Sequence, residues 1–198
     1  MRINRKITQN WAKTYESKPR DIFYLKTEKE IIHLVKYCNK YQTPLKIVGG
    51  ADSYNDIFCP GEYGFLVSLE KFNKLLDVDK ENHTATFEAG MMMPDLIKQL
   101  KRYNLAISNL GTNIFDCVAG SCSTGYHGSG INYKIFSSFV KTFELITQTG
   151  EKKVIHSDDE KFDIYAVGLG VLGIILKSLY RGTTFNPEVV EKKIILKK

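Results

Sequence analysis

The stretch from Ser108 to Gly130, SNLGTNIFDCVAGSCSTGYHGSG, constrains the fold most, because it has neither the two-residue period of a strand nor the 3.6-residue period of a helix. A segment of more than about 20 residues without such a period is uncommon in a compact domain and is often functional. Its seven glycines and serines from Gly120 onward leave backbone N–H groups accessible, which suits phosphate oxygens. A mobile surface loop is the alternative, but Ile114, Val118 and Cys122 indicate a packed segment. The stretch therefore predicts an anion-binding loop built into the domain.

Another glycine loop, VGGADSYND at residues 48–56, lies earlier in the chain and follows a strand-like run. We call it the first loop, and residues 108–130 the second loop. It contains two carboxylates but no lysine, arginine or histidine, in a chain of formal net charge +6. An anion bound there would be held by backbone N–H groups, which need no cationic side chain. The carboxylate of Asp52 would repel such an anion unless it is hydrogen-bonded or turned to solvent.

The periodic segments predict a mixture of helices and strands. Thr27 and Glu30 form a capping box at the start of an amphipathic helix, and Ser157 and Glu160 form a second one, whose short helix would run to about Val167. A further helix starts at residues 93–95, with proline in its first turn. We expect strands at 44–48, 65–69, 75–79, 83–89 and 172–180 and a hairpin of 139–147 with 152–156. Because strict βαβ alternation is absent, the pattern favours an α+β fold over a doubly wound sheet.

One further motif, Gly168-Leu-Gly-Val-Leu-Gly173, matches the dinucleotide pattern GxGxxG. That pattern requires a strand before it, a helix after it and an acidic residue about 20 positions later. Here a helical pattern precedes the motif and a strand follows it. We therefore reject a Rossmann domain.

Composition narrows the class of protein. A chain of 198 residues with 43% hydrophobic residues can bury one core. Its lysines are dispersed, whereas nucleic-acid binding requires a concentrated basic face. Its four cysteines show no CxxC spacing, which argues against zinc. The sequence has no secretory leader pattern and no apolar run of about 18 residues, so we expect a cytoplasmic protein with no metal, no nucleic-acid partner and no membrane partner.

Several segments occur in an order that resembles a known family: Asn10-Trp11-Ala12, the helix from Thr27, VGGADSYND, LLDVD with ATFEAG, SNLG, VAGSCSTGYHGSG and GLGVLGIIL. They resemble the FAD-binding (PCMH-type) domain of the vanillyl-alcohol oxidase superfamily, and within it the aldonolactone oxidases, which include L-gulonolactone oxidase; alditol oxidase is also similar. The resemblance covers roughly residues 10–182. It implies a two-lobed α+β domain with a small mixed sheet, an antiparallel sheet and flanking helices. We expect lobes of about 1–60 and 61–182, and residues 183–198 as a polar tail or the start of a missing substrate domain.

The resemblance also implies cofactor-binding positions. Residues 48–53 would wrap the diphosphate of FAD through backbone N–H groups, with a hydroxyl from Ser53. The ribityl and flavin side would be lined by Gly120, Ser121, Cys122 and Ser123, together with Thr112 and Cys117. Ile174 would hold the adenine end. His127 matches a family position, but bracing of its own loop is an equally good interpretation. The predicted cofactor-binding residues are Ile47, Val48, Gly49, Gly50, Ala51, Asp52, Ser53, Gly111, Thr112, Cys117, Gly120, Ser121, Cys122, Ser123, Thr124, His127 and Ile174.

Two positions differ from related sequences in ways that bear on mechanism. Covalent members of the family carry a flavin-linking histidine where this chain has Asp52, so the resemblance implies non-covalent FAD. Dehydrogenase-type relatives carry an alanine where this chain has Gly111. Glycine would leave oxygen a path to the flavin, which favours an oxidase.

The implied reaction is oxidation of a hydroxyl-bearing carbon in a sugar lactone or polyol, with O2 as the acceptor and H2O2 as the product. Relatives carry a substrate domain after the flavin domain, whereas this chain stops at Lys198, so we expect a protein partner or a missing C-terminal domain. No catalytic residue is identifiable. A flavin-binding module without turnover is the second hypothesis. A third is a flavin reductase resembling the enolpyruvoylglucosamine enzymes, but their Gly-Ser-Asn is absent from the first loop.

Overall fold

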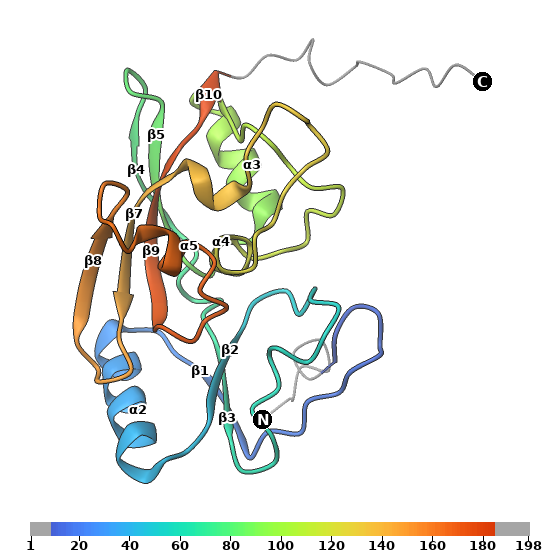
Figure 1. Cartoon of the computed structure of the whole chain (residues 1–198), viewed down its shortest axis with the longest axis vertical. Coiled ribbons are helices and arrows are strands. Elements are labelled where there is room, and N and C mark those ends of the chain that lie inside the picture. The colour runs from blue at the N-terminus through green and yellow to red at the C-terminus, as the bar shows by residue number, and fades with distance from the viewer. Residues whose placement is uncertain (1–8, 185–198) are drawn as a thin grey trace.

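A computed structural model describes residues 9–184 of the chain. A small sheet and a large sheet form two lobes, one below the other in Figure 1. The small sheet was expected to be mixed, but it is parallel throughout, with strand order β1-β3-β2. Its strands are β1 (Asp21–Tyr24), β2 (Leu45–Val48) and β3 (Phe65–Ser68).

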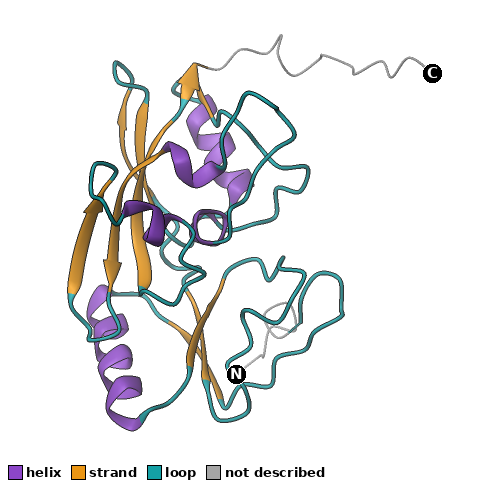
Figure 2. Ribbon diagram, in the orientation of Figure 1, coloured by secondary structure: helices purple, strands orange, loops and turns teal. Residues whose placement is uncertain are grey.

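The large sheet has five antiparallel strands in the order β4-β5-β9-β7-β8. These are β4 (Leu75–Asp79), β5 (Thr84–Glu88), β7 (Val140–Ile146), β8 (Lys152–His156) and β9 (Ile174–Arg181). Three helices lie beside one face of this sheet (Figure 2): α3 (Met93–Lys101), α4 (Val118–Ser123) and α5 (Phe162–Ala166). Two short strands, β6 (Leu105–Ala106) and β10 (Thr183–Thr184), pair with each other, and a 3-10 turn spans Phe136–Phe139. The predicted α+β class is confirmed.

The main core lies between the large sheet and its helices and extends to Phe65 and Val67 of β3. Tyr180 of β9 is fully buried and stacks on Phe136, with ring centroids 4.9 Å apart. Its hydroxyl accepts a hydrogen bond from the Ser108 N–H at 3.2 Å. The start of the long irregular segment is therefore fastened to the centre of the sheet.

Helix α2 (Glu28–Tyr41) runs between β1 and β2 of the small sheet and lies next to one end of the large sheet (Figure 1). Its predicted capping box is confirmed: the Glu30 N–H donates to the Thr27 hydroxyl, and the Glu30 carboxylate accepts from the Thr27 N–H. Its buried face joins the core through Ile31 and Val35, and Lys152 of β8 pairs with Glu28 at 3.2 Å. Within residues 9–184 no helix has the length and apolar character needed to cross a bilayer.

The second predicted capping box is wrong. Helix α5 begins at Phe162 after Lys161, without a side-chain cap. The carboxylate of Asp159 instead accepts the His156 N–H at 2.8 Å, which closes a turn at the end of β8.

The predicted lobe boundary near residue 60 precedes β3, although β3 lies at the centre of the small sheet. Strand β1 was not predicted from the sequence. Of the predicted polar tail, residues 183–184 form β10 and the rest lies outside the described residues.

Candidate functional site

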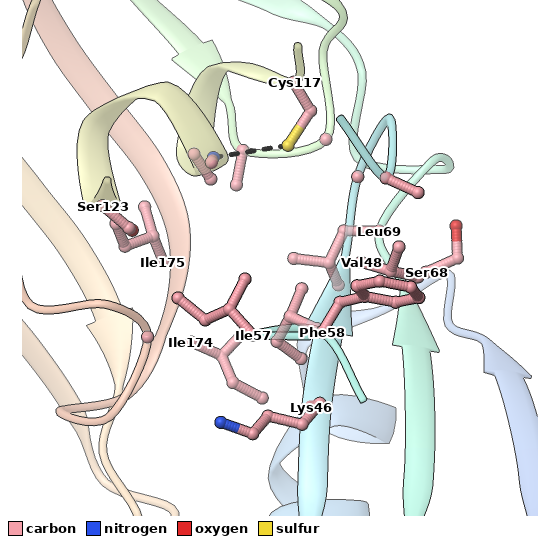
Figure 3. A pocket seen from close by; sticks show the side chains of 18 of the residues that line it. Lys46, Val48, Ile57, Phe58, Ser68, Leu69, Cys117, Ser123, Ile174 and Ile175 are labelled. Carbon is pink, nitrogen blue, oxygen red and sulfur yellow. Dashed lines mark hydrogen bonds between the residues drawn. The ribbon is translucent and has the colours of Figure 1, made fainter. Parts of the chain in front are cut away.

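A cavity of about 1500 Å³ is lined by residues of both lobes. Ligand pockets usually enclose about 300–1,000 Å³, so this one has room for a ligand the size of a dinucleotide. Figure 3 shows Ile174 and Ile175 of β9 among its lining side chains, together with Val48 of β2 and Cys117 at the start of α4. The two glycine loops predicted to bind an anion therefore meet at one cavity.

The first loop follows β2, and the second loop packs tightly against it. A Cβ at Gly49 would overlap the Cys117 side chain, and one at Gly50 would overlap the Phe115 carbonyl oxygen. Ala51 has a φ of 55°, a left-handed conformation that costs roughly 1–2 kcal/mol in a residue with a Cβ. The loop is thus held in a strained turn by close approach of two backbones.

The backbone N–H groups of this turn are available to a ligand. Among the described residues, the N–H groups of Ala51, Asp52 and Ser53 have no acceptor, and all three residues line the cavity. A turn that includes a left-handed residue can aim successive N–H dipoles at one anion. This arrangement supplies the anion-binding donors that the sequence predicted.

Helix α4 forms a small-residue wall opposite the first loop. Cys117 occupies the N-cap and accepts the Gly120 N–H at 3.4 Å (Figure 3). Burial raises the pKa of the Cys117 thiol, so the sulfur stays protonated and acts as a packing group. A Cβ at Gly120 would meet only this sulfur, at 3.5 Å. The helix therefore leaves room for a ligand at Gly120.

Carboxylates lie on the cavity wall between the loops. Asp52 accepts a hydrogen bond from the Asn113 amide, and burial raises its pKa despite that bond. Burial, together with the nearby charge of Asp52, raises the pKa of Asp116 to about 6. The Asp52 carboxylate is hydrogen-bonded and turned toward the second loop, so its repulsion of an anion bound at the first loop is reduced.

Of the predicted cofactor-binding residues, twelve line the cavity. They are Ile47, Val48, Gly49, Gly50, Ala51, Asp52, Ser53, Cys117, Gly120, Ser123, Thr124 and Ile174.

The other five, which are Gly111, Thr112, Ser121, Cys122 and His127, do not line the cavity. Ser121 and Cys122 lie on the side of α4 that faces the core and are 1% and 0% exposed. His127 is exposed and its Nδ1 lies 3.0 Å from the Gly128 carbonyl oxygen, which fits the loop-bracing interpretation. A Cβ at Gly111 would lie 2.7 Å from the Tyr126 ring. Tyr126 thus fills the space directly beside Gly111.

Sequence reasoning missed several lining residues, among them Lys46, Phe115, Asp116 and Val171. The Lys46 side chain lies in the lower part of the view in Figure 3. Its place directly before the predicted loop could have revealed it. Phe115 and Val171, 68% and 67% exposed, are apolar residues at loop positions, a weaker signal.

The residues of the cavity fit FAD. The backbone at Gly49 and Gly50 closely approaches the second loop, N–H groups without an acceptor among residues 9–184 suit a diphosphate, and apolar walls suit a flavin or adenine ring. Fold and cavity together define a two-lobed α+β domain that can hold an extended dinucleotide. The chain belongs to a known family of such domains: a family model described as "FAD binding domain" matches residues 19–155.

Individual relatives agree with this assignment. The chain is 37% identical to L-gulonolactone oxidase of Mus musculus over 174 residues, which cover 85% of this chain and 38% of that protein. It is 32% identical to D-arabinono-1,4-lactone oxidase of Candida albicans over 185 residues, or 85% of this chain and 33% of that protein. Among solved structures, alkyldihydroxyacetonephosphate synthase superposes with a TM-score of 0.75 at 22% identity, covering 84% of this chain and 32% of that one. The chain thus spans about a third of the length of each relative.

Proposed function

We propose that the chain binds FAD non-covalently and forms the flavin-holding part of an oxidoreductase that acts on a hydroxyl-bearing carbon of a sugar lactone or polyol. The observation that carries the proposal is the cavity where both glycine loops meet, with Asp52 on its wall. The names of the relatives, L-gulonolactone oxidase and D-arabinono-1,4-lactone oxidase, support the substrate class.

The chain's own residues have defined tasks in this proposal. The N–H groups of Ala51–Ser53 bind the diphosphate, Gly120 admits the flavin portion, and Ile174 packs at the adenine end. Asn113 keeps the Asp52 carboxylate on the second loop. When bound, FAD supplies the capacity to accept a hydride, while the protein supplies orientation and electrostatics.

Molecular oxygen is the proposed acceptor, with H2O2 as the product. With Tyr126 filling the space beside Gly111, this part of the proposal rests on the oxidase names of the relatives. The substrate-binding groups would come from a further domain or a partner protein. A cytoplasmic location also stays a prediction.

A second candidate is a flavin-binding module without turnover of its own. It is favoured by the lining of the cavity, which includes carboxylates but no histidine among the described residues. Such a module would bind FAD and leave the chemistry to residues supplied by another protein.

One experiment tests whether the chain turns over substrate by itself. The FAD-loaded chain is mixed under argon with L-gulonolactone, D-arabinono-1,4-lactone or a sugar alcohol, and flavin absorbance is followed. Bleaching that reverses when air is admitted, with formation of H2O2, supports the oxidoreductase and rules out the module. A flavin that stays oxidised with every substrate rules out turnover by this chain alone, and a chain that binds no FAD overturns both candidates.

A further inference from the structure

The segment Gln9–Glu16 folds into a small hairpin, closed by an antiparallel bridge between its first and last residues. We call this segment the bracket. It lies outside residues 19–155, which the family model matches. The bracket nevertheless contacts the first glycine loop, because the Trp11 N–H donates to the Ala51 carbonyl oxygen at 3.0 Å.

Asn10 organises the bracket and is only 2% exposed. Its Oδ1 accepts the N–H groups of Thr14 and Tyr15 at 2.9 and 3.0 Å. Its Nδ2 donates to the Thr14 hydroxyl at 3.0 Å and to the Ser53 carbonyl oxygen at 3.1 Å. A buried amide that makes all four of these bonds holds its neighbours in one geometry.

The bracket acts on one side of the loop's backbone. It engages the carbonyl oxygens of Ala51 and Ser53, while the N–H groups of residues 51–53 have no acceptor among the described residues. The left-handed φ of Ala51 is unfavourable for a residue with a Cβ, so contacts outside the loop must maintain it. The bracket supplies two such contacts.

We propose that Asn10 is a positioning residue for the cofactor: through the bracket it holds residues 51–53 in the conformation that presents their N–H groups to a diphosphate. The inference rests on the proposed function, because it assigns a diphosphate to this loop. It predicts that loss of Asn10 weakens the binding of ligands that carry the diphosphate and leaves the binding of ligands without it unchanged.

The test compares Asn10→Ala with Thr14→Val as a matched control. Thr14→Val removes one acceptor of the Asn10 amide but keeps the bond to the Ser53 carbonyl oxygen. Dissociation constants are measured for FAD, for ADP, which carries the diphosphate, and for riboflavin, which carries no phosphate. Circular dichroism confirms folding, and if Asn10→Ala does not fold, Asn10→Asp replaces it because it retains the acceptors for Thr14 and Tyr15.

We expect Asn10→Ala to raise the dissociation constants of FAD and ADP by about tenfold. A factor of this size corresponds to the loss of one hydrogen bond whose net contribution is near the upper end of the usual range. The dissociation constant of Asn10→Ala for riboflavin, and those of Thr14→Val for all three ligands, should change by less than about threefold. Adding Ala51→Gly to Asn10→Ala should restore part of the loss, because glycine adopts a positive φ at no steric cost.

A folded Asn10→Ala variant that binds FAD like the wild type overturns the inference. Equal losses for FAD and riboflavin, or no recovery with Ala51→Gly, also overturn it, since either would mean that Asn10 acts only on overall stability. A wild-type chain that binds neither FAD nor ADP overturns the proposed function itself.

Discussion

Substitution of Gly120 by alanine should stabilise the protein and weaken its cofactor binding. Gly120 lies within α4, where alanine is favoured over glycine by roughly 0.5–1 kcal/mol. The new methyl would meet only the Cys117 sulfur, at an ordinary 3.5 Å, so the stabilisation is not offset by a clash. For a chain of this size it corresponds to a rise in melting temperature of about 1–4 °C.

The same methyl would project into the cavity at the proposed flavin side. Overpacking by one methyl typically costs about 1–3 kcal/mol, which corresponds to an increase of about 5-fold to 150-fold in the dissociation constant for FAD. The melting temperature is measured without FAD, and binding is followed by quenching of the fluorescence of Trp11, the single tryptophan, which lines the cavity.

Gly49→Ala is the matched comparison, because its Cβ would overlap the Cys117 side chain. We expect that variant to lose both stability and FAD binding. If Gly120→Ala binds FAD with wild-type affinity, the flavin does not occupy the space beside α4, and the proposed placement is wrong.

Three further predictions concern two carboxylates on the cavity wall and one glycine in the fold. Burial and the charge of Asp52 raise the pKa of Asp116 to about 6, above the ordinary value of about 3.9. The folded state therefore binds this proton more tightly than the unfolded state, so stability should fall as pH rises from about 4 to 6. FAD affinity should weaken over the upper part of that range as the wall gains charge, and Asp116→Asn should flatten both profiles in melting and titration experiments. Gly90→Ala should destabilise the fold by about 1–3 kcal/mol in urea titrations, because its Cβ would overlap the Leu69 carbonyl oxygen; an unchanged midpoint would contradict this close approach of Gly90 to Leu69. Asp52→His should retain part of its flavin after acid precipitation, with Asp52→Asn as the acid-labile control; a colourless Asp52→His pellet would contradict the assignment of this position.

The sequence predicted the large sheet well, since the alternation of residues 83–89 and the hairpin around Gly150 are local signals. Strand β1 carries no such signal. Its four residues, DIFY, are too few to show a period, and they form a strand because they pair with β3 in parallel. Ser157 and Glu160 show the opposite error, since a capping box was predicted where none forms. The Asp159 carboxylate accepts the His156 N–H and closes a turn, and the helix begins only after that turn.

The candidate site was predictable only as two loops. Their glycines indicate close approach, yet the meeting of Gly49 with Cys117 is a long-range contact that neither segment encodes alone. Sequence reasoning also could not tell which side of α4 faces the cavity. It placed Ser121 and Cys122 in the site with Gly120 and Ser123, whereas the first two belong to the core.

We propose that the two glycine loops together bind FAD without a covalent bond. To test this, the purified full chain is titrated with FAD while Trp11 fluorescence is monitored, and the complex is then precipitated with acid. We predict saturable quenching with one FAD per chain, competition by ADP, and a colourless pellet with all flavin in the supernatant. Absence of saturable quenching, or flavin that remains in the washed pellet, would contradict the claim.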